Sequence, residues 1–271
     1  MRSEAQPVCL SIAGLDPSGG AGVIADVKTF RAFGCYAAAA ITSVTFQNTT
    51  GVFGSVHQTA DSVHRQVDAV LDDLNVVAIK TGMLPTREII ETVADIIRER
   101  EVQNVVVDPV VRSTSGYDLI DKLALRALTQ TLFPLATVVT PNIPETELIT
   151  GVAIESEDDI RDAAAIIQHM GAKNVLIKGG HLYEKGRKGV REKGRSAVDH
   201  LFVGDLGHAL ASGFIETTAT HGTGCVLSSA IASNLALGKS LTDAVAAAKE
   251  FVTNAIRTAP RIGHGHSPIN V

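Results

Sequence analysis

The sequence predicts an α/β fold, with a doubly wound, mostly parallel sheet that carries helices on both faces. Three observations lead to this prediction. Short β-branched runs alternate along the chain with longer runs whose apolar residues recur at helical spacing. The short runs show little polar alternation, as expected for strands that are buried on both faces. The chain has 271 residues and 45% hydrophobic content, which suffices for one full core, so we expect a single domain over residues 1–271.

The individual elements follow in chain order. Apolar runs predict strands, and apolar residues at helical spacing predict helices between them, with Gly171 as a helix C-cap. The predicted strands cover 8–14, 37–46, 76–83, 104–111, 136–142 and 174–180, and the predicted helices cover 27–34, 60–74, 86–100, 120–133 and 157–171. In such a sheet, the carboxyl ends of the strands face a ligand crevice. We therefore expect function in SIAGLD, TFQN, IKTGM, DPVV, TPN and IKGG.

One segment interrupts this alternation. Residues 182–205 are rich in glycine, arginine and lysine, which predicts a mobile loop or a hairpin. Its basic part, 183–196, is the only plausible patch for a polyanion. Two interpretations stay open: a solvated loop, or a flap whose cations approach a nucleotide.

Charge and cysteine content exclude several classes of protein. The formal charge of −5 argues against a general binder of nucleic acid or membrane surfaces, and no apolar run is long enough for a membrane span. The N-terminal segment contains Glu4 and is too short in apolar residues for a secretory signal, so export is not expected. Three cysteines without a CxxC pair fit a reducing compartment. We expect a cytoplasmic protein.

The glycine-rich segment after the first strand invites a dinucleotide-binding interpretation, because Gly20, Gly22 and Ala25 satisfy G-x-G-x-x-A. We reject it, since TFQNTTGV stands where the acidic residue of that motif is expected. A Walker A motif is also missing. The segment is either a connecting turn or part of a site, and Asp26 favours a site because its carboxylate could accept a hydrogen bond from a small polar ligand.

A second glycine turn, in THGTGCVLSSAIA, places Cys225 at a predicted helix start. Gly222 and Gly224 can adopt positive φ and leave backbone N–H groups exposed, and the helix N-terminus carries positive partial charge. Anions should bind there.

These segments together resemble a known family. SIAGLDPSGGAGVIADVKTF, TFQNTTGV, IKTGMLPT, VVVDPVV, TPNIPETELITG, VLIKGGH, ATHGTGCVLSSAIA and GHGHSPIN occur in the order found in the hydroxymethylpyrimidine and hydroxymethylpyrimidine-phosphate kinases of thiamin biosynthesis, which have the ribokinase-like fold. The resemblance covers nearly the whole chain. It implies a homodimer that uses ATP and Mg²⁺ to phosphorylate the hydroxymethyl group of 4-amino-5-hydroxymethyl-2-methylpyrimidine and then the monophosphate.

The resemblance also implies roles for residues on the phosphate side of the site. Phosphoryl transfer needs positioned phosphates, a metal ion and donors for the developing charge. The backbone of Gly222, Thr223, Gly224 and Cys225 would form the anion hole, and the carboxylates would hold Mg²⁺. The implied metal residues are Asp108 and Glu145, and the implied ATP residues are Asn142, Lys178 and Thr223. Taken alone, each carboxylate could instead be a helix cap or a charged loop residue. Lys178 could instead be a solvated residue at the end of a strand.

On the acceptor side, the resemblance assigns Gln47 and Asp26 to the aminopyrimidine ring and Gly14 and Val110 to the pocket wall. One amide can pair at once with an exocyclic amine and a ring nitrogen; a glutamine that merely ends a strand is the alternative. Cys225 stands where related sugar kinases carry an aspartate base. We expect the helix N-terminus to favour a thiolate that takes the hydroxyl proton, the alternative being a small buried thiol.

Some features depart from the family pattern or leave the substrate open. Family members carry lysine where this chain has Thr114, with Arg112 two residues earlier, and serine where it has Leu15. A pyridoxal kinase of the same superfamily is the nearest alternative, and a non-catalytic nucleotide- or ligand-binding protein is a more distant one. Three histidines in glycine-rich segments lack matching cysteines, so we do not expect a zinc site: His221, His264 and His266.

Overall fold

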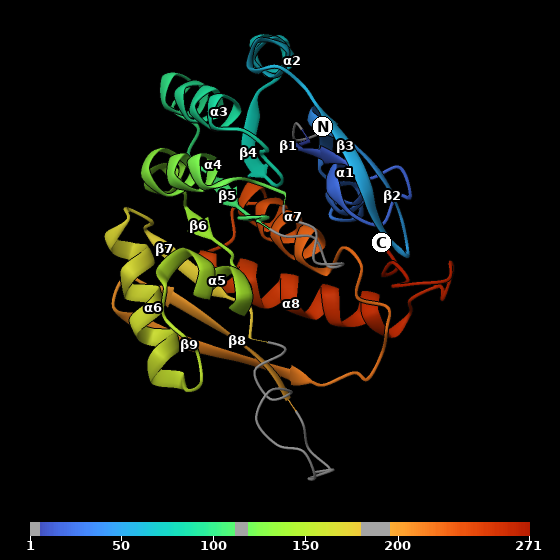
Figure 1. The fold of residues 1–271 in the computed structure, drawn as a ribbon, viewed down its shortest axis with the longest axis vertical. Coiled ribbons are helices and arrows are strands. Elements are labelled where there is room, and N and C mark those ends of the chain that lie inside the picture. Colours follow the sequence, from blue (N-terminus) through green and yellow to red (C-terminus); the bar gives the residue numbers. More distant parts are fainter. Residues whose placement is uncertain (1–5, 112–118, 180–195) are drawn as a thin grey trace, which may run out of the picture.

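The computed structural model describes residues 6–111, 119–179 and 196–271. Within them, one nine-stranded sheet has the order β3-β2-β1-β4-β5-β6-β7-β8-β9 (Figure 1). The strands from β2 to β7 in this order are parallel, and β3, β8 and β9 are antiparallel to their neighbours. Their bounds are β1 Val8–Leu15, β2 Tyr36–Asn48, β3 Gly51–His57, β4 Val76–Thr81, β5 Val105–Val107, β6 Val138–Val139, β7 Asn174–Ile177, β8 Ser196–Val203 and β9 Leu206–Gly213.

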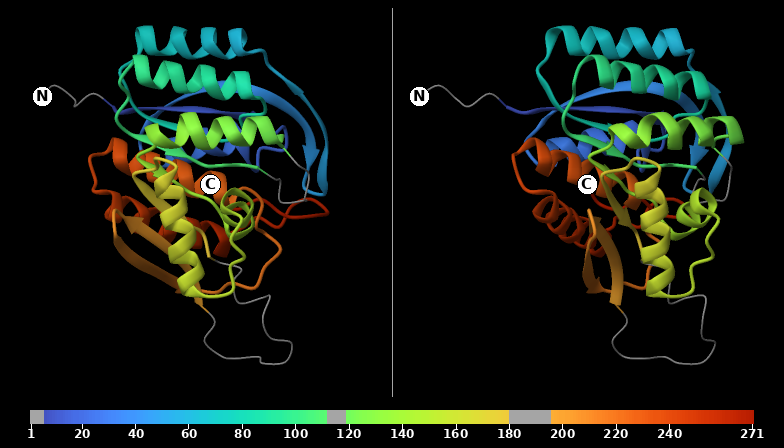
Figure 2. Two further views of the ribbon diagram at one scale, coloured as in Figure 1. Left: turned by 60° about the vertical axis from the view of Figure 1, so that its left-hand side comes forward. Right: turned by 90° about the vertical axis from the view of Figure 1, so that its left-hand side faces the viewer.

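Helices cover both faces of this sheet (Figure 2). The core under α1, α7 and α8 is separate from the larger core under α2, α3, α4 and α6. The helix bounds are α1 Gly22–Ala32, α2 Ala60–Asp73, α3 Arg87–Glu99, α4 Lys122–Ala127, α5 Ile143–Thr150, α6 Glu157–His169, α7 Thr223–Ala236 and α8 Leu241–Arg257. The predicted doubly wound α/β architecture is confirmed.

The predicted elements differ from the observed ones in several places. The strand β3 and the helix α5 were not predicted, because β3 is a short, partly exposed edge strand with two glycines and α5 has only 8 residues. The strand β9 and the helix α8 were not predicted either. The predicted helix 120–133 is divided: α4 passes into a π-helical turn, Leu128–Leu132, and then a 3-10 turn, Phe133–Leu135, which contains a proline. Of the segment predicted as a loop or hairpin, residues 196–203 form β8 and pair with β9, while 180–195 lie outside the described residues.

The sheet order places a ligand crevice beside β1. This strand pairs with β2 on one side and β4 on the other, so the chain winds in opposite directions from it. Ligands of open α/β sheets bind at such a switch point, outside the carboxyl ends of the strands. Strand alternation then directs polar side chains toward α7: Lys80 follows Ala78 of the α7-side core by two residues, and Asp108 follows Val106 in the same way.

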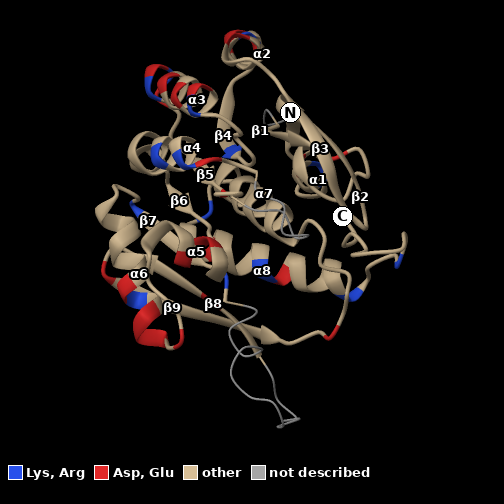
Figure 3. Ribbon diagram, viewed as in Figure 1, with Lys and Arg blue, Asp and Glu red and all other residues tan. Residues whose placement is uncertain are grey.

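Helix α7 is the central helix on its face of the sheet. It contacts α1, α8, β1, β4 and β5, and its residues from Val226 to Leu235 are buried. Figure 3 shows charged residues on α2, α3 and α6, whereas α7 carries none. Among the described residues, no helix combines the length and apolar character required to cross a membrane.

Candidate active site

A cavity of about 1040 Å³ opens at the carboxyl ends of the parallel strands. Its wall is built from the ends of β1, β4, β5 and β7, the starts of α5 and α7, the hairpin β8–β9 and part of α8. Most of the residues that the sequence singled out line it: Gly14, Gln47, Asp108, Val110, Asn142, Glu145, Lys178, Gly222, Thr223, Gly224 and Cys225. Asp26 is missing from this wall. Arg112, Thr114 and residues 183–195 lie outside the described residues.

The turn before α7 presents backbone donors to this cavity. Gly222 is the N-cap residue with φ of 84°, and a side chain there would collide with the carbonyl oxygen of Gly20. No side chain caps the helix, and the N–H of Thr223 donates to the carbonyl oxygen of Thr220 at 3.3 Å, so the ligand-facing donors are those of the other residues in this turn. Thr223 Oγ1 donates to the carbonyl oxygen of Thr220 at 3.1 Å, which holds the turn in place. The arrangement suits an anion at the start of α7.

Asp108 and Lys178 meet beside this turn. The Lys178 Nζ lies 2.9 Å from Asp108 Oδ1, and their side chains are 15% and 3% exposed. A Cβ added to Gly224 would lie 3.2 Å from that Nζ, so the ammonium almost touches the turn. Burial would lower the pKa of Lys178, but Asp108 and Glu145 together raise it above its ordinary value. The site therefore holds a fixed positive charge next to the α7 N-terminus.

Glu145 joins the same group and has two structural tasks. Its carboxylate accepts from the backbone N–H of Asn142 at 2.8 Å, and the Asn142 side chain accepts from the backbone of Glu145 at 2.9 Å. This capping box starts α5. Burial, opposed by Lys178 and reinforced by Asp108, raises the pKa of Glu145 to about 7. Glu145 is thus a helix cap whose carboxyl also faces the cavity and ionises near neutral pH.

Asp16 and His221 form a contact that the sequence analysis missed. His221 Nε2 lies 2.8 Å from Asp16 Oδ2, and the same carboxylate accepts from the backbone of Ser18 and Ala21. Burial would raise the pKa of Asp16, but the hydrogen bonds of His221, Ser18 and Gln47 lower it to about 2. This contact ties the loop after β1 to the turn before α7, two segments that are distant in sequence. His221 was considered only as a metal ligand.

Asp26 is a correction, because it lies beneath the cavity rather than on its wall. Its side chain is 0% exposed, and both carboxylate oxygens bind the ammonium of Lys80, at 2.9 and 2.8 Å. Ser11 and Ser229 donate their hydroxyl groups to it as well. A carboxylate with these partners has no free face for a ring. Lys80, which ends β4 much as Lys178 ends β7, was not predicted and does line the cavity.

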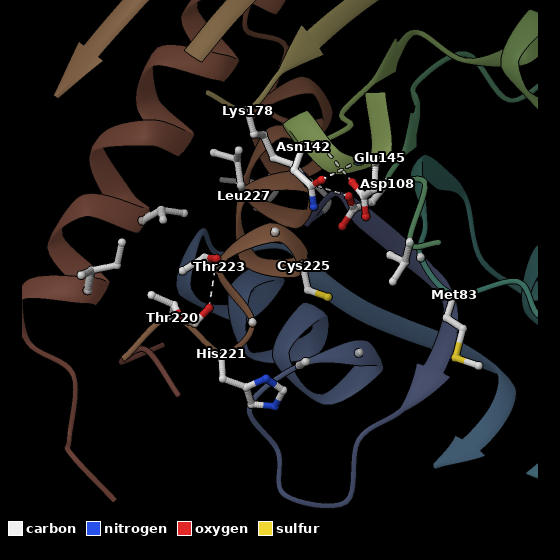
Figure 4. Close-up of a pocket in the computed structure, with 18 of the residues that line it drawn as sticks. Met83, Asp108, Asn142, Glu145, Lys178, Thr220, His221, Thr223, Cys225 and Leu227 are labelled. Carbon is white, nitrogen blue, oxygen red and sulfur yellow. Dashed lines mark hydrogen bonds and ion pairs between the residues drawn. The ribbon is translucent and has the colours of Figure 1, made fainter. Parts of the chain in front are cut away.

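Cys225 requires a second correction. We expected the helix N-terminus to favour a thiolate, but burial raises the pKa of the thiol to about 11, and the positive charge of Lys80 only partly opposes this effect. The negative charges of Asp26 and Asp108 raise it further, and a hydrogen bond from the Gly22 backbone lowers it. Figure 4 shows Cys225 with Asp108, Glu145 and Lys178 on one side and His221 on the other.

Comparison with known proteins identifies relatives along almost the whole chain. The family model described as phosphomethylpyrimidine kinase matches residues 16–270. A hydroxymethylpyrimidine/phosphomethylpyrimidine kinase of Haemophilus influenzae is 43% identical over 96% of this chain and 95% of its own length. A thiamine biosynthesis bifunctional protein of Geobacter sulfurreducens is 44% identical over 96% of this chain, which spans 51% of that longer protein.

Solved structures show the same fold. A phosphomethylpyrimidine kinase of Clostridium difficile has a TM-score of 0.79 and 40% identity, over 93% of this chain and 100% of that one. An ADP complex of Bacillus subtilis pyridoxal kinase has a TM-score of 0.86 and 36% identity, over 98% of this chain and 97% of that one.

Proposed function

Since the chain belongs to the phosphomethylpyrimidine kinase family, we propose that it transfers the terminal phosphoryl group of ATP to the hydroxymethyl group of 4-amino-5-hydroxymethyl-2-methylpyrimidine. The monophosphate would then accept a second phosphoryl group to give the diphosphate. The site residues serve this reaction on two sides of one cavity, the phosphate side at the α7 N-terminus and the acceptor side at the ends of β1 and β2.

The observation that carries the proposal is the meeting of three features at one point. The uncapped start of α7, the Lys178 ammonium and the thiol of Cys225 line the same cavity. Backbone donors and a fixed cation stabilise the charge that develops on a transferred phosphoryl group. A side chain that accepts a proton beside them defines where the acceptor hydroxyl binds.

The residues then divide the first transfer between them. The acceptor hydroxyl oxygen bonds to phosphorus, the bond from phosphorus to the leaving ADP oxygen breaks, and the hydroxyl proton passes to the sulfur of Cys225 in its thiolate form, whose formation burial of the thiol opposes. The N–H groups of Gly222 and Gly224 hold the phosphoryl oxygens, and Lys178 balances their charge. Asn142 and Thr223 position the nucleotide phosphates. Gln47 holds the ring through its amide, and Gly14 and Val110 form the wall against which the ring packs.

Asp108 and Glu145 fit a magnesium ion that accompanies the nucleotide. Mg²⁺ is usually bound by one or two protein carboxylates together with water and phosphate oxygens. The charge of Asp108 helps to raise the pKa of Glu145, so the two carboxyls lie close together, and a cation would relieve their repulsion. When bound, the ion would neutralise phosphate charge. Among the described residues no larger group of metal-ligating side chains occurs, which agrees with a metal held mainly by its nucleotide.

Pyridoxal is the second candidate acceptor, because the similar pyridoxal kinase structure shares the fold over nearly the whole chain. Relatives at 41–47% identity that are named hydroxymethylpyrimidine/phosphomethylpyrimidine kinases favour the pyrimidine. A coupled assay of ADP release separates the two: the purified protein is given ATP, Mg²⁺ and either acceptor. A higher kcat/KM for the pyrimidine is expected. Preference for pyridoxal would overturn the substrate, and release with neither acceptor would point to a ligand-binding protein.

The assembly and location proposed for the chain are those implied by the family. We infer one domain, because a single sheet spans the described residues, and a homodimer. Exposed apolar side chains on β2 and β3 support an interface with a second copy: Phe46, Phe53 and Val56 are 53%, 68% and 55% exposed. Analytical ultracentrifugation tests it. Three free cysteines support a cytoplasmic location.

A further inference from the structure

The buried pair Asp26–Lys80 lies close to the start of α7, where Cys225 stands. Ser229, whose hydroxyl donates to Asp26 at 2.7 Å, follows Cys225 by four residues on α7. Side chains with this spacing lie on the same face of a helix, about 5–6 Å apart. Cys225 also packs in the same cluster as Ala25, the neighbour of Asp26 on α1. Two independent contacts therefore place the ion pair next to the thiol.

The Lys80 ammonium is held in one position by its hydrogen bonds to Asp26 and by the space that Gly82 leaves beside it. Within the described residues, Nζ donates two hydrogen bonds, both to Asp26, and an ammonium has three donors. A Cβ added to Gly82 would lie 2.9 Å from Nζ, so a glycine at this position leaves room for the ammonium at the cavity floor. Lys80, Gly82 and Cys225 all line the cavity. The positive end of the pair therefore lies at the same cavity as the thiol.

We propose that the pair Asp26–Lys80 is an electrostatic support for Cys225, in which the Lys80 ammonium stabilises the negative charge of the deprotonated sulfur and Asp26 holds that ammonium in place. Lys80 is then a positioning residue that acts through Cys225. Its catalytic meaning rests on the proposed function, in which the sulfur takes the hydroxyl proton.

The charges around Cys225 determine in which direction each of them shifts the pKa of its thiol. Lys80 on β4 lowers the pKa of Cys225, and Asp26 on α1 and Asp108 just after β5 raise it. Lys178, just after β7, has its own pKa raised by Cys225 and so also favours the thiolate. Removing the Lys80 charge should therefore disfavour the thiolate, and removing the Asp26 charge should favour it. A general loosening of the fold would move both variants in one direction.

The rate of Cys225 alkylation by iodoacetamide, followed by mass spectrometry from pH 7 to 10 without substrate, measures the thiolate directly. At pH 9 we expect Lys80→Met to slow alkylation by about tenfold or more, and Asp26→Asn to accelerate it. Lys249→Met is the matched control, because Lys249 pairs with Asp199 at 2.7 Å and lines the same cavity, but its charge is not among those that shift Cys225. Cys225→Ala gives the background from the two buried cysteines.

Each outcome decides the proposal. Opposite shifts in the two variants, with the Lys249→Met profile unchanged, support it. Unchanged profiles, or a shift of both variants in the same direction, overturn it. If Lys80→Met does not fold, the absence of faster alkylation in Asp26→Asn overturns it alone. The proposed role of the sulfur can fail separately. Opposite shifts of the alkylation profile together with normal turnover of Cys225→Ala would support the electrostatic coupling, but they would show that the sulfur takes no part in the reaction.

Discussion

Two of the aspartate–lysine pairs at the cavity, Asp26–Lys80 and Asp108–Lys178, differ in how completely they are enclosed. Their closest contacts are alike, 2.8 Å for Asp26–Lys80 and 2.9 Å for Asp108–Lys178. The first pair is 0% exposed on both sides, and two serine hydroxyls complete the shell of its carboxylate. In the second pair the lysine is 15% exposed, and the hydroxyls of Thr140 and Ser228 reach Asp108 only at 3.3 Å.

This difference separates an ion pair that keeps its partners from an ion pair that can exchange them for a ligand. A fully enclosed pair with satisfied hydrogen bonds keeps one geometry, because any separation would leave a charge in a low-dielectric interior. A pair at the cavity wall can exchange partners, since an incoming phosphate or cation would compensate both members. We therefore assign Asp26–Lys80 to the support of Cys225 and Asp108–Lys178 to ligand binding.

The largest effect is expected at Cys225, which lies between the two pairs. Cys225→Ala removes the proton acceptor but leaves the backbone donors of the turn, so turnover should fall by about 10²–10⁴-fold while ATP and the pyrimidine still bind. Steady-state kinetics and calorimetric titration measure the two quantities. Cys225→Asp should restore part of the rate. Normal turnover in the alanine variant would leave the enclosed pair with no reacting group to support, and lost ATP binding would show that the cysteine only maintains the turn.

Stability should distinguish the pairs next. Lys80→Met leaves Asp26 as an uncompensated buried charge and should lower the free energy of unfolding by about 3–5 kcal/mol. Lys178→Met should cost clearly less, because Asp108 can bind water from the cavity. Urea unfolding of both variants gives the comparison. Equal losses would mean that the two pairs are enclosed to the same degree in solution.

Lys178, whose loss should cost less stability, should matter more directly for binding the phosphates. Lys178→Met removes a fixed cation at the α7 N-terminus, so kcat should fall by about 10²–10³-fold, as for the loss of one preorganised donor. The KM for ATP should rise as well. Lys249→Met, at the far part of the same cavity, is the control for general damage. If Lys178→Met retained full activity, the pair Asp108–Lys178 would have only a structural role.

Several of these assignments could be predicted from local sequence and others could not. The alternation of strands and helices and the α7 start at GTGC depend on neighbouring residues, and they were predicted. Lys80 and Lys178 stand in similar segments, IKTG and IKGG, but only tertiary contacts reveal which lysine is enclosed, since the partner of Lys80 is 54 residues away. Asp26 was assigned to the aminopyrimidine ring for the same reason: its position after the glycine-rich turn is visible in the sequence, and the direction of its side chain is not.

The pKa of Cys225 shows the same limit. A helix N-terminus can be predicted from a glycine turn, and by itself it favours a thiolate. The depth at which the turn is buried depends on how α1, β4 and α8 pack around α7, and burial raises the pKa of the thiol to about 11. Local reasoning therefore placed Cys225 at the start of a helix and gave the wrong direction for the shift of its pKa. The β8–β9 hairpin and its Asp199–Lys249 pair likewise depend on long-range pairing.

A smaller effect is expected from the pH dependence of stability, through Glu145, which lies beside Asp108 and Lys178. Its pKa is raised from 4.5 to about 7, so the protonated form is favoured in the folded chain. The stabilisation is complete below pH 4.5 and is lost as pH rises from about 4.5 to about 7, by about 3 kcal/mol. Glu145→Gln should remove this part of the pH dependence, measured as the difference between the two stability profiles. Magnesium with nucleotide should shift the wild-type transition to lower pH, and identical profiles with and without Glu145 would place its carboxyl in solvent.

The smallest effect belongs to a neutral side chain outside both pairs. Gln47 lines the cavity from β2, and its amide hydrogen-bonds to Asp16. Gln47→Leu keeps a similar volume but leaves the donor and acceptor of the pyrimidine unpaired, which costs about 1–3 kcal/mol of affinity. Because this side chain is neutral and lies on the acceptor side, the affinity for ATP should hardly change. Isothermal titration with each ligand separates the two. Equal weakening of both would show that Gln47 maintains the cavity through Asp16 and His221, whereas a loss confined to the pyrimidine would place recognition of the ring apart from both charged pairs.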